Sequence, residues 1–312
     1  MSLFIGFDTS NYTTSVAAYD GERVCSHKRL LDVKPGELGL RQSDAVFSHT
    51  QRLPSLAHDL FSEVDGKIAA VAASTRPRAA EGSYMPCFLV GEGQGRVLAD
   101  AVEAPFYAVS HQQGHVAAAA WSSGRMDLLD REFLAYHASG GTTELLYVRQ
   151  GADGLPICER IGGTTDLAAG QIVDRCGVKL GLGFPCGIEL EKLALKAEPQ
   201  KPFLPKADGC EFSLSGLENK FSALIGVESP EKTARFVLDS ISAVLERCVD
   251  RALEKYGKLE LLCAGGVMSN TIIRERFERK FGAYFAEPRF SSDNAAGVAL
   301  LAARLFEREG AH

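Results

Sequence analysis

Short apolar runs separated by turn-forming residues open the chain and return near its middle. Near the start they are Leu3–Phe7, Thr14–Tyr19 and Val24–Leu30, and near the middle they are Phe133–Ala138, Thr143–Val148 and Ile157–Ile161. Residues 8–11 and 20–21 separate the first set, and Ser139-Gly140-Gly141 and residues 150–154 separate the second. Each set predicts a three-stranded antiparallel meander. The chain therefore contains the same pattern twice, about 130 residues apart.

After each meander the spacing of apolar residues predicts helices that alternate with short buried strands. The predicted helices are Ser48–Glu63, Asp166–Leu180, Glu189–Lys196, Ala234–Tyr256 and Asn294–Arg308. The predicted strands are Ile68–Ser74, Phe106–Val109, Leu259–Ala264 and Ala283–Ala286. Residues 97–101 lead into helical or connecting structure.

The duplicated pattern predicts an α/β protein of the actin-like ATPase fold, with two ribonuclease-H-like lobes and a central cleft. We expect residues 1–130 to form the first lobe and residues 131–293 the second, with a last helix over about 294–310 returning to the first. In such a fold the turns after the first strands of each lobe face a nucleotide, and their N–H groups bind its phosphates. Two unrelated α/β domains are the alternative interpretation.

Composition narrows the class of protein. The formal net charge of −6 is unlike that of a dedicated nucleic-acid binder, so a contact with RNA requires a local basic patch or a partner subunit. The first residues resemble a strand rather than a signal peptide, and the apolar run Val116–Trp121 is too short to span a membrane. The eight cysteines include no C-x-x-C pair and form no convincing Cys-His arrangement. These features predict a soluble cytoplasmic enzyme with reduced thiols.

His111 and His115 are candidate metal ligands. Their spacing of four residues places them on one face of a helix, with Ser110 as its N-cap and Val116–Ala120 as its continuation. The alternative is a histidine pair with no metal. Asp293, just before the last helix, is either an N-cap or a third ligand, which would complete a set suited to iron or zinc. His137, at the end of a predicted strand, is a further candidate ligand.

Four turn segments are candidates for the lining of a nucleotide site, because turns and glycines after strands allow a close approach to phosphate or ribose. They are residues 8–10, which include Ser10, residues 139–143, residues 184–187, which end at Gly187, and residues 265–270, which end at Asn270. Asp174, on a predicted helix, could accept a hydrogen bond from a ribose hydroxyl. It could equally pair with Arg175 or Lys179 on a solvated surface.

Seven segments of the chain, in their order along it, resemble the TsaD-type threonylcarbamoyltransferases, once called O-sialoglycoprotein endopeptidases. They are residues 110–115, 139–145, 166–179, 181–193, 212–217, 265–270 and 292–296, and the resemblance extends from Ile5 almost to the end of the chain. The family makes threonylcarbamoyladenosine next to the anticodon of tRNAs that read codons beginning with A.

The resemblance implies site residues and ligands. His111, His115 and Asp293 match the family's metal ligands, with His137 where another branch has a tyrosine ligand. Asp174, Gly187, Glu191 and Asn270 match contacts to adenosine and ribose, and the five residues from His137 through Ala138, Ser139 and Gly140 to Gly141 match the substrate-binding turn. The implied cofactors are one divalent iron or zinc ion and an adenylate or ATP-type nucleotide. The implied partners are threonylcarbamoyl-adenylate, tRNA and TsaB- or TsaE-like proteins. The resemblance implies no association with a membrane.

The implied chemistry is attack of the N6 amine of a tRNA adenosine on the carbonyl of threonylcarbamoyl-adenylate, assisted by the metal and without an enzyme nucleophile. Asn11-Tyr12-Thr13 replaces acidic residues of the family's first turn, and Thr142 replaces a histidine or asparagine. These departures keep open a paralogous carbamoyltransferase-like enzyme with another acceptor. A non-catalytic scaffold partner of TsaD is the other alternative, although the retained histidine pair speaks against it.

Overall fold

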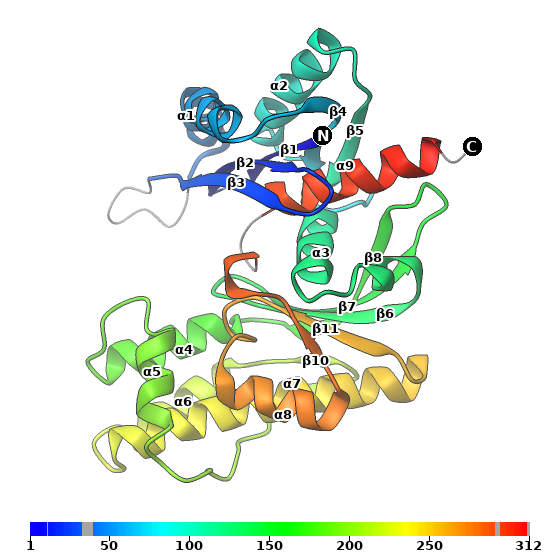
Figure 1. Ribbon diagram of the computed structural model, residues 1–312. Coiled ribbons are helices and arrows are strands. Elements are labelled where there is room, and N and C mark those ends of the chain that lie inside the picture. The colour runs from blue at the N-terminus through cyan, green and yellow to red at the C-terminus, as the bar shows by residue number, and fades with distance from the viewer. Residues whose placement is uncertain (11, 33–39, 291–293, 311–312) are drawn as a thin grey trace. The chain divides into compact units, whose positions relative to one another are not determined.

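The computed structural model describes residues 1–10, 12–32, 40–290 and 294–310. The chain divides into two compact units, each with its own sheet (Figure 1). Unit 1 comprises Met1–Asp130, Arg149–Cys158 and Ser292–His312, and unit 2 comprises Arg131–Val148 and Glu159–Ser291. Within the described residues, no helix combines the length and the apolar character that a membrane span requires.

Unit 1 contains a five-stranded sheet with the order β3-β2-β1-β4-β5. The strands are β1 (Ser2–Ser10), β2 (Thr13–Tyr19), β3 (Val24–Leu30), β4 (Lys67–Arg76) and β5 (Phe106–Ser110). The first three strands pair antiparallel, which confirms the predicted first meander. Strands β4 and β5 continue the sheet in parallel with β1. A functional site on unit 1 must therefore be formed by side chains of this sheet and of the helices that pack on it.

Helices cover both faces of the first sheet, and the two-residue period of β1 explains how. Leu3, Ile5 and Phe7 point to one face, where they pack with leucines of α1 (Gln42–Glu63) and with Ala99 of α2 (Phe88–Ala101). Phe4 and Gly6 point to the other face. There the ring of Phe4 lies 5.7 Å from that of Phe306 in α9 (Ala295–Gly310), and a Cβ on Gly6 would lie 2.3 Å from the Ala295 carbonyl oxygen.

Helix α3 (His111–Ser122) packs closely against α9, and the 3-10 helix η1 (Met126–Asp130) follows it. The contact depends on two glycines, because a Cβ on Gly297 would lie 1.8 Å from the carbonyl oxygen of Gly114. The first turns of α3 and α9 are consequently neighbours, which brings Asn294 next to His111.

Unit 2 contains a seven-stranded sheet with the order β12-β11-β6-β7-β8-β10-β9. The strands are β6 (Phe133–Ala138), β7 (Thr143–Gln150), β8 (Pro156–Thr164), β9 (Ala207–Asp208), β10 (Glu211–Phe212), β11 (Glu260–Ala264) and β12 (Tyr284–Phe285). β6 pairs antiparallel with β7, as the second predicted meander requires, and its third strand, β8, lies next to β7 in the sheet. β11 is parallel to both β6 and β12.

The helices of unit 2 share one apolar core with this sheet. They are α4 (Ala169–Lys179), α5 (Gly187–Ala194), α6 (Ser215–Leu224), α7 (Pro230–Tyr256) and α8 (Thr271–Phe281), and the 3-10 helix η2 (Pro288–Phe290) follows β12. Val237, Ile241 and Leu245 of α7 are fully buried, as the helical spacing of apolar residues predicted. The core thus holds the ends of β6, β11 and α4 at defined positions, and these ends carry the glycine-containing turns.

Some helix boundaries differ from the sequence prediction. Helix α1 begins at Gln42 rather than Ser48, and α2 begins at Phe88 although the sequence indicated helical or connecting structure only from residue 97. Three glycines give α2 a low intrinsic helix propensity, but Gly91 and Gly95 let it approach Thr9 and Phe106 closely. Packing therefore outweighs propensity in this helix.

The helix predicted over Asp166–Leu180 begins only at Ala169. The Asp166 carboxylate is engaged elsewhere, because it accepts hydrogen bonds from the Ser213 hydroxyl and from the backbone N–H groups of Leu214 and Ser215. These bonds hold Asp166 in the loop before α4 and anchor the start of α6, a helix that the sequence pattern did not predict.

Candidate functional site

The two histidines of α3 lie side by side at the start of the helix. Ser110 caps α3 with its side chain and forms a capping box with Gln113, so the predicted cap and helix are confirmed. The rings of His111 and His115 have centroids 4.6 Å apart. Both side chains are partly exposed. Two imidazoles at this separation on one helical face can share a metal ion.

A buried carboxylate lies behind His111. Asp8 is at the end of β1 and has no exposed surface, and its Oδ2 accepts a hydrogen bond from His111 Nδ1 at 2.8 Å. The same oxygen accepts from the Ser74 hydroxyl at 2.5 Å and from Asn294 Nδ2 at 3.3 Å. Because an ionised carboxylate only accepts, Nδ1 of His111 donates to Asp8, and Nε2 is the ring nitrogen that can bind a ligand when the ring is neutral.

The electrostatics of this cluster favour an ionised Asp8. Burial acts to raise the pKa of the Asp8 carboxyl, but the charge and hydrogen bond of His111, the Ser74 hydroxyl and the charge of His115 outweigh it. The net pKa of Asp8 therefore lies well below its usual range. Asp8 is thus a fixed negative charge directly behind the histidine pair.

Asn294 adds a polar atom that protein groups leave unsatisfied. Its side-chain amide nitrogen donates to Asp8 and to the His111 carbonyl oxygen and also contacts His111 Nδ1. Its Oδ1 is buried and has no hydrogen-bond partner within the described part of the chain. A buried oxygen of this kind beside two histidines is suited to a cation or a donor from outside the protein. Asp293, the predicted third ligand, lies outside the described residues.

Another histidine next to this cluster was missed by the sequence prediction. His49 of α1 is fully buried, and its Nδ1 lies 2.8 Å from the Thr14 hydroxyl at the start of β2. Burial lowers the pKa of His49 to about 4, so the ring is neutral near pH 7. His49 therefore supports the start of β2, next to the end of β1, where the backbone N–H of the predicted site residue Ser10 donates to Asp8 Oδ1.

Unit 2 contains a pocket of about 500 Å³ among the glycine-containing turns. Five predicted site residues line it, namely Gly140, Asp174, Gly187, Glu191 and Asn270. The other lining residues are Gly170, Val173, Pro185, Ile188, Leu238, Gly266, Val267, Ser269 and Pro288. The volume is in the range of pockets that bind nucleotide-sized ligands.

Close backbone packing shapes one wall of this pocket. At the start of α4, a Cβ on Gly170 would lie 2.5 Å from the Ser139 carbonyl oxygen, and the N–H of Gly170 donates to that oxygen. Gly265 has φ +99° and faces the Ala138 carbonyl, which accepts from the N–H of Val267. Only glycine allows β6, β11 and α4 to meet this closely. His137, Ala138, Ser139 and Gly141 belong to this strand end and turn, but among the described residues only Gly140 of the segment lines the pocket.

Asp174 takes neither of the surface ion pairs considered as its alternative. Its Oδ1 accepts from the N–H of Cys186, whereas Arg175 and Lys179 both pair with Glu218. Asp174 faces a different side of α4 from Arg175, because residues i and i+1 of a helix point about 100° apart. Its Oδ2 makes no hydrogen bond within the described part of the chain, so it can accept one from a ligand in the pocket.

Glu191 and Asn270 bind one another in a second wall of the pocket. Asn270 Nδ2 donates to Glu191 Oε2 at 3.0 Å, and Thr271 donates to Glu191 Oε1 through both its N–H and its hydroxyl. Asn270 Oδ1 also caps α8 by accepting from the N–H of Ile273. The two residues were predicted as separate contacts, but they form one hydrogen-bonded wall.

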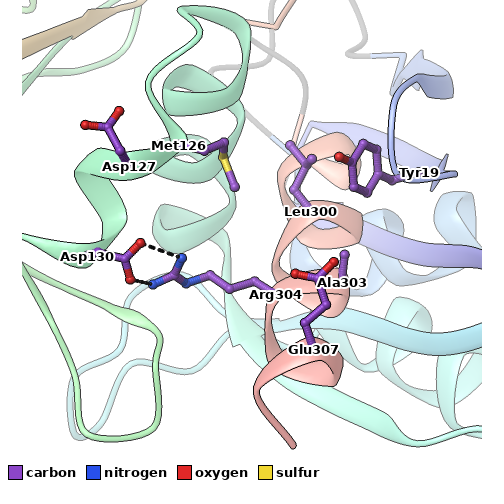
Figure 2. Close-up of a pocket in the computed structure, with 8 residues that line it drawn as sticks. All are labelled: Tyr19, Met126, Asp127, Asp130, Leu300, Ala303, Arg304 and Glu307. Atoms are coloured by element: carbon purple, nitrogen blue, oxygen red, sulfur yellow. Dashed lines mark hydrogen bonds and ion pairs between the residues drawn. The ribbon is translucent and has the colours of Figure 1, made fainter. Parts of the chain in front are cut away.

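A smaller pocket of unit 1, about 280 Å³, contains none of the predicted site residues (Figure 2). Arg304 of α9 reaches across it to form an ion pair with Asp130. Tyr19 lines it from the end of β2, and burial followed by the charge of Glu307 raises the pKa of Tyr19. The Arg304–Asp130 ion pair therefore joins α9 to η1 across this pocket.

Comparisons with known proteins agree with this architecture. A family model described as "TsaD: tRNA N6-adenosine threonylcarbamoyltransferase" matches residues 34–300. A curated protein named tRNA N6-adenosine threonylcarbamoyltransferase from Thermus thermophilus is similar to this chain, at 36% identity over 97% of this chain and 93% of that protein.

Two solved structures are similar in fold. HypF from T. kodakarensis has a TM-score of 0.60 and 13% identity, over 99% of this chain and 48% of that chain. The activator of the 2-hydroxyisocaproyl-CoA dehydratase from Clostridium difficile, with bound ADPNP, has a TM-score of 0.53 and 14% identity, over 99% and 97% of the two chains. These likenesses confirm the predicted α/β fold of the actin-like ATPase class, with its two sheets.

Proposed function

The chain belongs to the family of tRNA N6-adenosine threonylcarbamoyltransferases, and we propose that it carries out the reaction for which the family is named. It transfers a threonylcarbamoyl group from threonylcarbamoyl-adenylate to the N6 amine of an adenosine in tRNA. The amine attacks the carbamoyl carbonyl, the bond to the adenylate phosphate breaks, and AMP leaves as the amine loses a proton. Both products account for all atoms of the two substrates, so no oxidant or reductant is needed.

The pocket of unit 2 is our proposed adenylate site, because the residues that line it offer the contacts that an adenylate requires. Val173, Leu238 and Pro288 offer apolar surface to a purine ring. Asp174 Oδ2 is placed to accept from a ribose hydroxyl. Gly187 is the first residue of α5, and the first N–H groups of a helix have no acceptor within the helix. These three kinds of contact match the three parts of an adenylate.

His111 and His115 are our proposed metal ligands in unit 1. The donor set fits a divalent ion, because Asp8 holds the proton on Nδ1 of His111 and Asn294 Oδ1 is a buried oxygen without a partner among the described residues. Iron or zinc suits two imidazoles, and Asp293 is the carboxylate that we expect to complete the set. When bound, such an ion polarises a carbonyl or phosphoryl oxygen of the substrate. The predicted role of His137 as a further ligand stays a prediction.

Partner proteins are part of the proposal because of the charge of the chain. A net charge of −6 does not provide the phosphate neutralisation on which RNA affinity depends. TsaB- and TsaE-like proteins are the partners that we expect to supply or complete the surface for tRNA. We expect the protein to act on tRNA in the cytoplasm.

Label transfer tests the proposed reaction. Purified protein is incubated with labelled threonylcarbamoyl-adenylate, tRNA and the candidate partner proteins, and label in the tRNA is measured. We expect incorporation that is lost in His111→Ala. No incorporation with any combination of partners and tRNA, by a protein that is folded, would overturn the proposed reaction.

A matched pair of variants tests the pocket. Val173 lines the pocket from α4, and Val178 is on the same helix with 55% of its surface exposed. We expect Val173→Phe to weaken adenylate binding at least tenfold, which corresponds to about 1.4 kcal/mol, and Val178→Phe to leave it unchanged. Equal affinities in two folded variants would place the adenylate elsewhere while leaving the reaction itself intact.

A further inference from the structure

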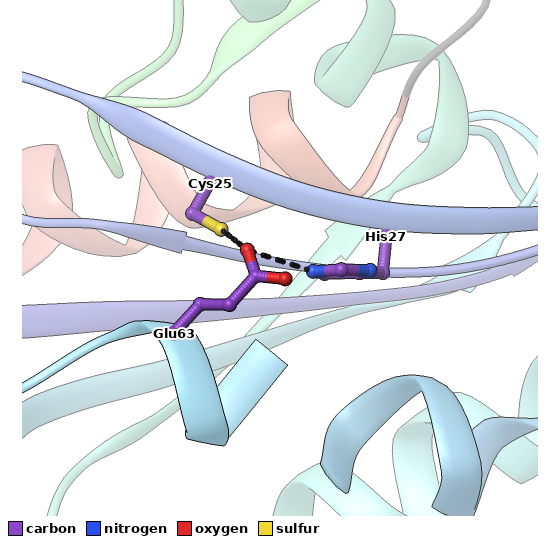
Figure 3. Close-up of side chains that lie close together, drawn as sticks. All are labelled: Cys25, His27 and Glu63. Atoms are coloured by element: carbon purple, nitrogen blue, oxygen red, sulfur yellow. Dashed lines mark hydrogen bonds and ion pairs between the residues drawn. The ribbon is translucent and has the colours of Figure 1, made fainter. Parts of the chain in front are cut away.

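A cysteine, a histidine and a glutamate meet on unit 1 at the edge of the first sheet (Figure 3). Cys25 and His27 are both on β3, two residues apart, so their side chains share one face of that strand. Glu63 is the last residue of α1 and reaches toward both. The sequence showed no convincing Cys-His arrangement for a nucleophile, and it gave no sign that α1 brings a carboxylate to the Cys-x-His segment of β3.

The distances within this cluster match those between ligands of one metal ion. Glu63 Oε2 lies 3.4 Å from Cys25 Sγ and 3.3 Å from His27 Nε2, and all three ligand atoms lie within 4.8 Å of one another. Zinc bonds of about 2.0 to 2.3 Å at tetrahedral angles place neighbouring ligand atoms about 3.3 to 3.6 Å apart. The three atoms can therefore occupy three corners of a tetrahedron after small side-chain movements.

The imidazole supplies an independent observation. His27 Nε2 is buried and makes no hydrogen bond within the described part of the chain, although it faces the Glu63 carboxylate. A buried ring nitrogen without a hydrogen bond is a costly feature in a protein. A cation held between this nitrogen, the thiolate and the carboxylate would satisfy all three groups at once.

We propose that Cys25, His27 and Glu63 bind a divalent zinc ion, at a site that is separate from the histidine pair of α3. Sulfur, imidazole nitrogen and carboxylate oxygen are the ligands that zinc accepts in proteins. The side chain of Glu63 is 54% exposed, so solvent can reach the fourth coordination position. β3 is the edge strand of its sheet, and the ion ties this strand to the end of α1.

The competing interpretation is a cluster held together without metal. In that case the Cys25 thiol donates to Glu63 and a protonated His27 pairs with the same carboxylate. Such contacts near the surface contribute little to stability. The two interpretations differ in one measurable property, which is the presence of a thiolate-to-metal bond.

Cobalt substitution tests the proposal. The full-length protein carrying His111→Ala and His115→Ala, so that the α3 pair contributes no ligand, is titrated with Co²⁺ and with Zn²⁺ alone. We expect one equivalent of bound ion, a near-ultraviolet charge-transfer band from thiolate to Co²⁺, and loss of this band when Zn²⁺ is added. Adding Cys25→Ser removes the band and weakens Zn²⁺ binding at least tenfold.

Two further variants are needed, one as a control for the thiol and one to test the second ligand. Cys158→Ser removes another partly buried thiol of unit 1 and should change neither the band nor the affinity. His27→Gln should weaken Zn²⁺ binding at least tenfold while circular dichroism shows a folded protein. Binding without a thiolate band, or equal affinity in the Cys25→Ser and Cys158→Ser proteins, would overturn the proposal. Label transfer to tRNA is measured separately, so the failure of one proposal does not imply the failure of the other.

Discussion

The polar cluster around Asp8 and the pocket of unit 2 are built in different ways. In the cluster, four donors bind the buried carboxylate of Asp8. They are the nearby backbone N–H of Ser10 and, from distant segments, the side chains of Ser74, His111 and Asn294. In the pocket, the walls are mainly backbone and glycine, and its carboxylates Asp174 and Glu191 each accept from a neighbouring backbone N–H group. The cluster should therefore be sensitive to the loss of one charge, and the pocket to the gain of one methyl group.

Asp8→Asn should have the largest effect, because it removes the charge around which the cluster is built. The amide cannot accept from all four donors, and leaving buried donors unsatisfied around a former charge costs about 3 kcal/mol of unfolding free energy. Metal affinity should fall 10- to 100-fold, because His111 loses the group that orients it. Chemical denaturation and metal titration measure the two effects.

Asp20→Asn is the control for that variant. Asp20 accepts from the N–H groups of Glu22 and Arg23 in an exposed turn of the same unit, so its replacement should cost less than about 1 kcal/mol and leave metal binding unchanged. Similar losses in the two variants would mean that the cluster is no more sensitive to charge than an ordinary turn.

Gly170→Ala should have the next largest effect, and it acts on the pocket. The new Cβ would lie 2.5 Å from the Ser139 carbonyl oxygen, so α4 or the turn must move, at a cost of about 2 kcal/mol. Adenylate affinity, measured by calorimetry, should fall at least tenfold. Gly183→Ala is the matched control, because a Cβ there meets nothing within 4 Å, and unchanged affinity in both variants would contradict the backbone-built pocket.

The pH dependence of stability should show the effect of burying His49 against β2. The pKa of His49 is lowered to about 4 in the folded protein and is about 6.5 in the unfolded chain, so only the unfolded state gains a proton between these values. Stability therefore falls as the pH decreases from 6.5 toward 4, by up to about 1.4 kcal/mol per pH unit.

His49→Gln should remove this contribution, as measured by urea denaturation at several pH values. His58→Gln is the control, since His58 is on the same helix but exposed. If the two variants kept equal slopes between pH 6.5 and 4, the burial of His49 would not be the cause of the pH dependence.

Glu191→Gln should have the smallest effect, and it acts on the hydrogen-bonded wall of the pocket. The new amide group cannot accept from both Asn270 and Thr271, so the start of α8 should lose about 1 kcal/mol. Glu189→Gln, on the same helix and paired with Lys192 at the surface, should change stability by less than about 0.5 kcal/mol. If adenylate affinity falls far more in Glu191→Gln than the stability loss explains, Glu191 contacts the ligand directly.

The differences between expected and observed structure have physical causes at particular residues. The strands of both meanders, the helix after Ser110 and the buried stripe of α7 were predictable, because periodicity and capping act within a few residues. The start of α2 was not, because its glycines are favourable only once Thr9 and Phe106 lie beside them. The partner of Asp174 was not either, because Cys186 reaches it only after the chain has turned after α4.

The class of fold, the family, and the helix that carries His111 and His115 could be inferred from the sequence, because apolar spacing, caps and ordered motifs are local properties of the chain. Three contacts became visible only in the folded protein: Asp8 holds His111 across 103 residues, Glu191 binds the cap of α8, and Glu63 lies beside Cys25 and His27. Each of these contacts joins segments whose distance in space cannot be inferred from their separation along the chain. The packing of helices on sheets brings them together.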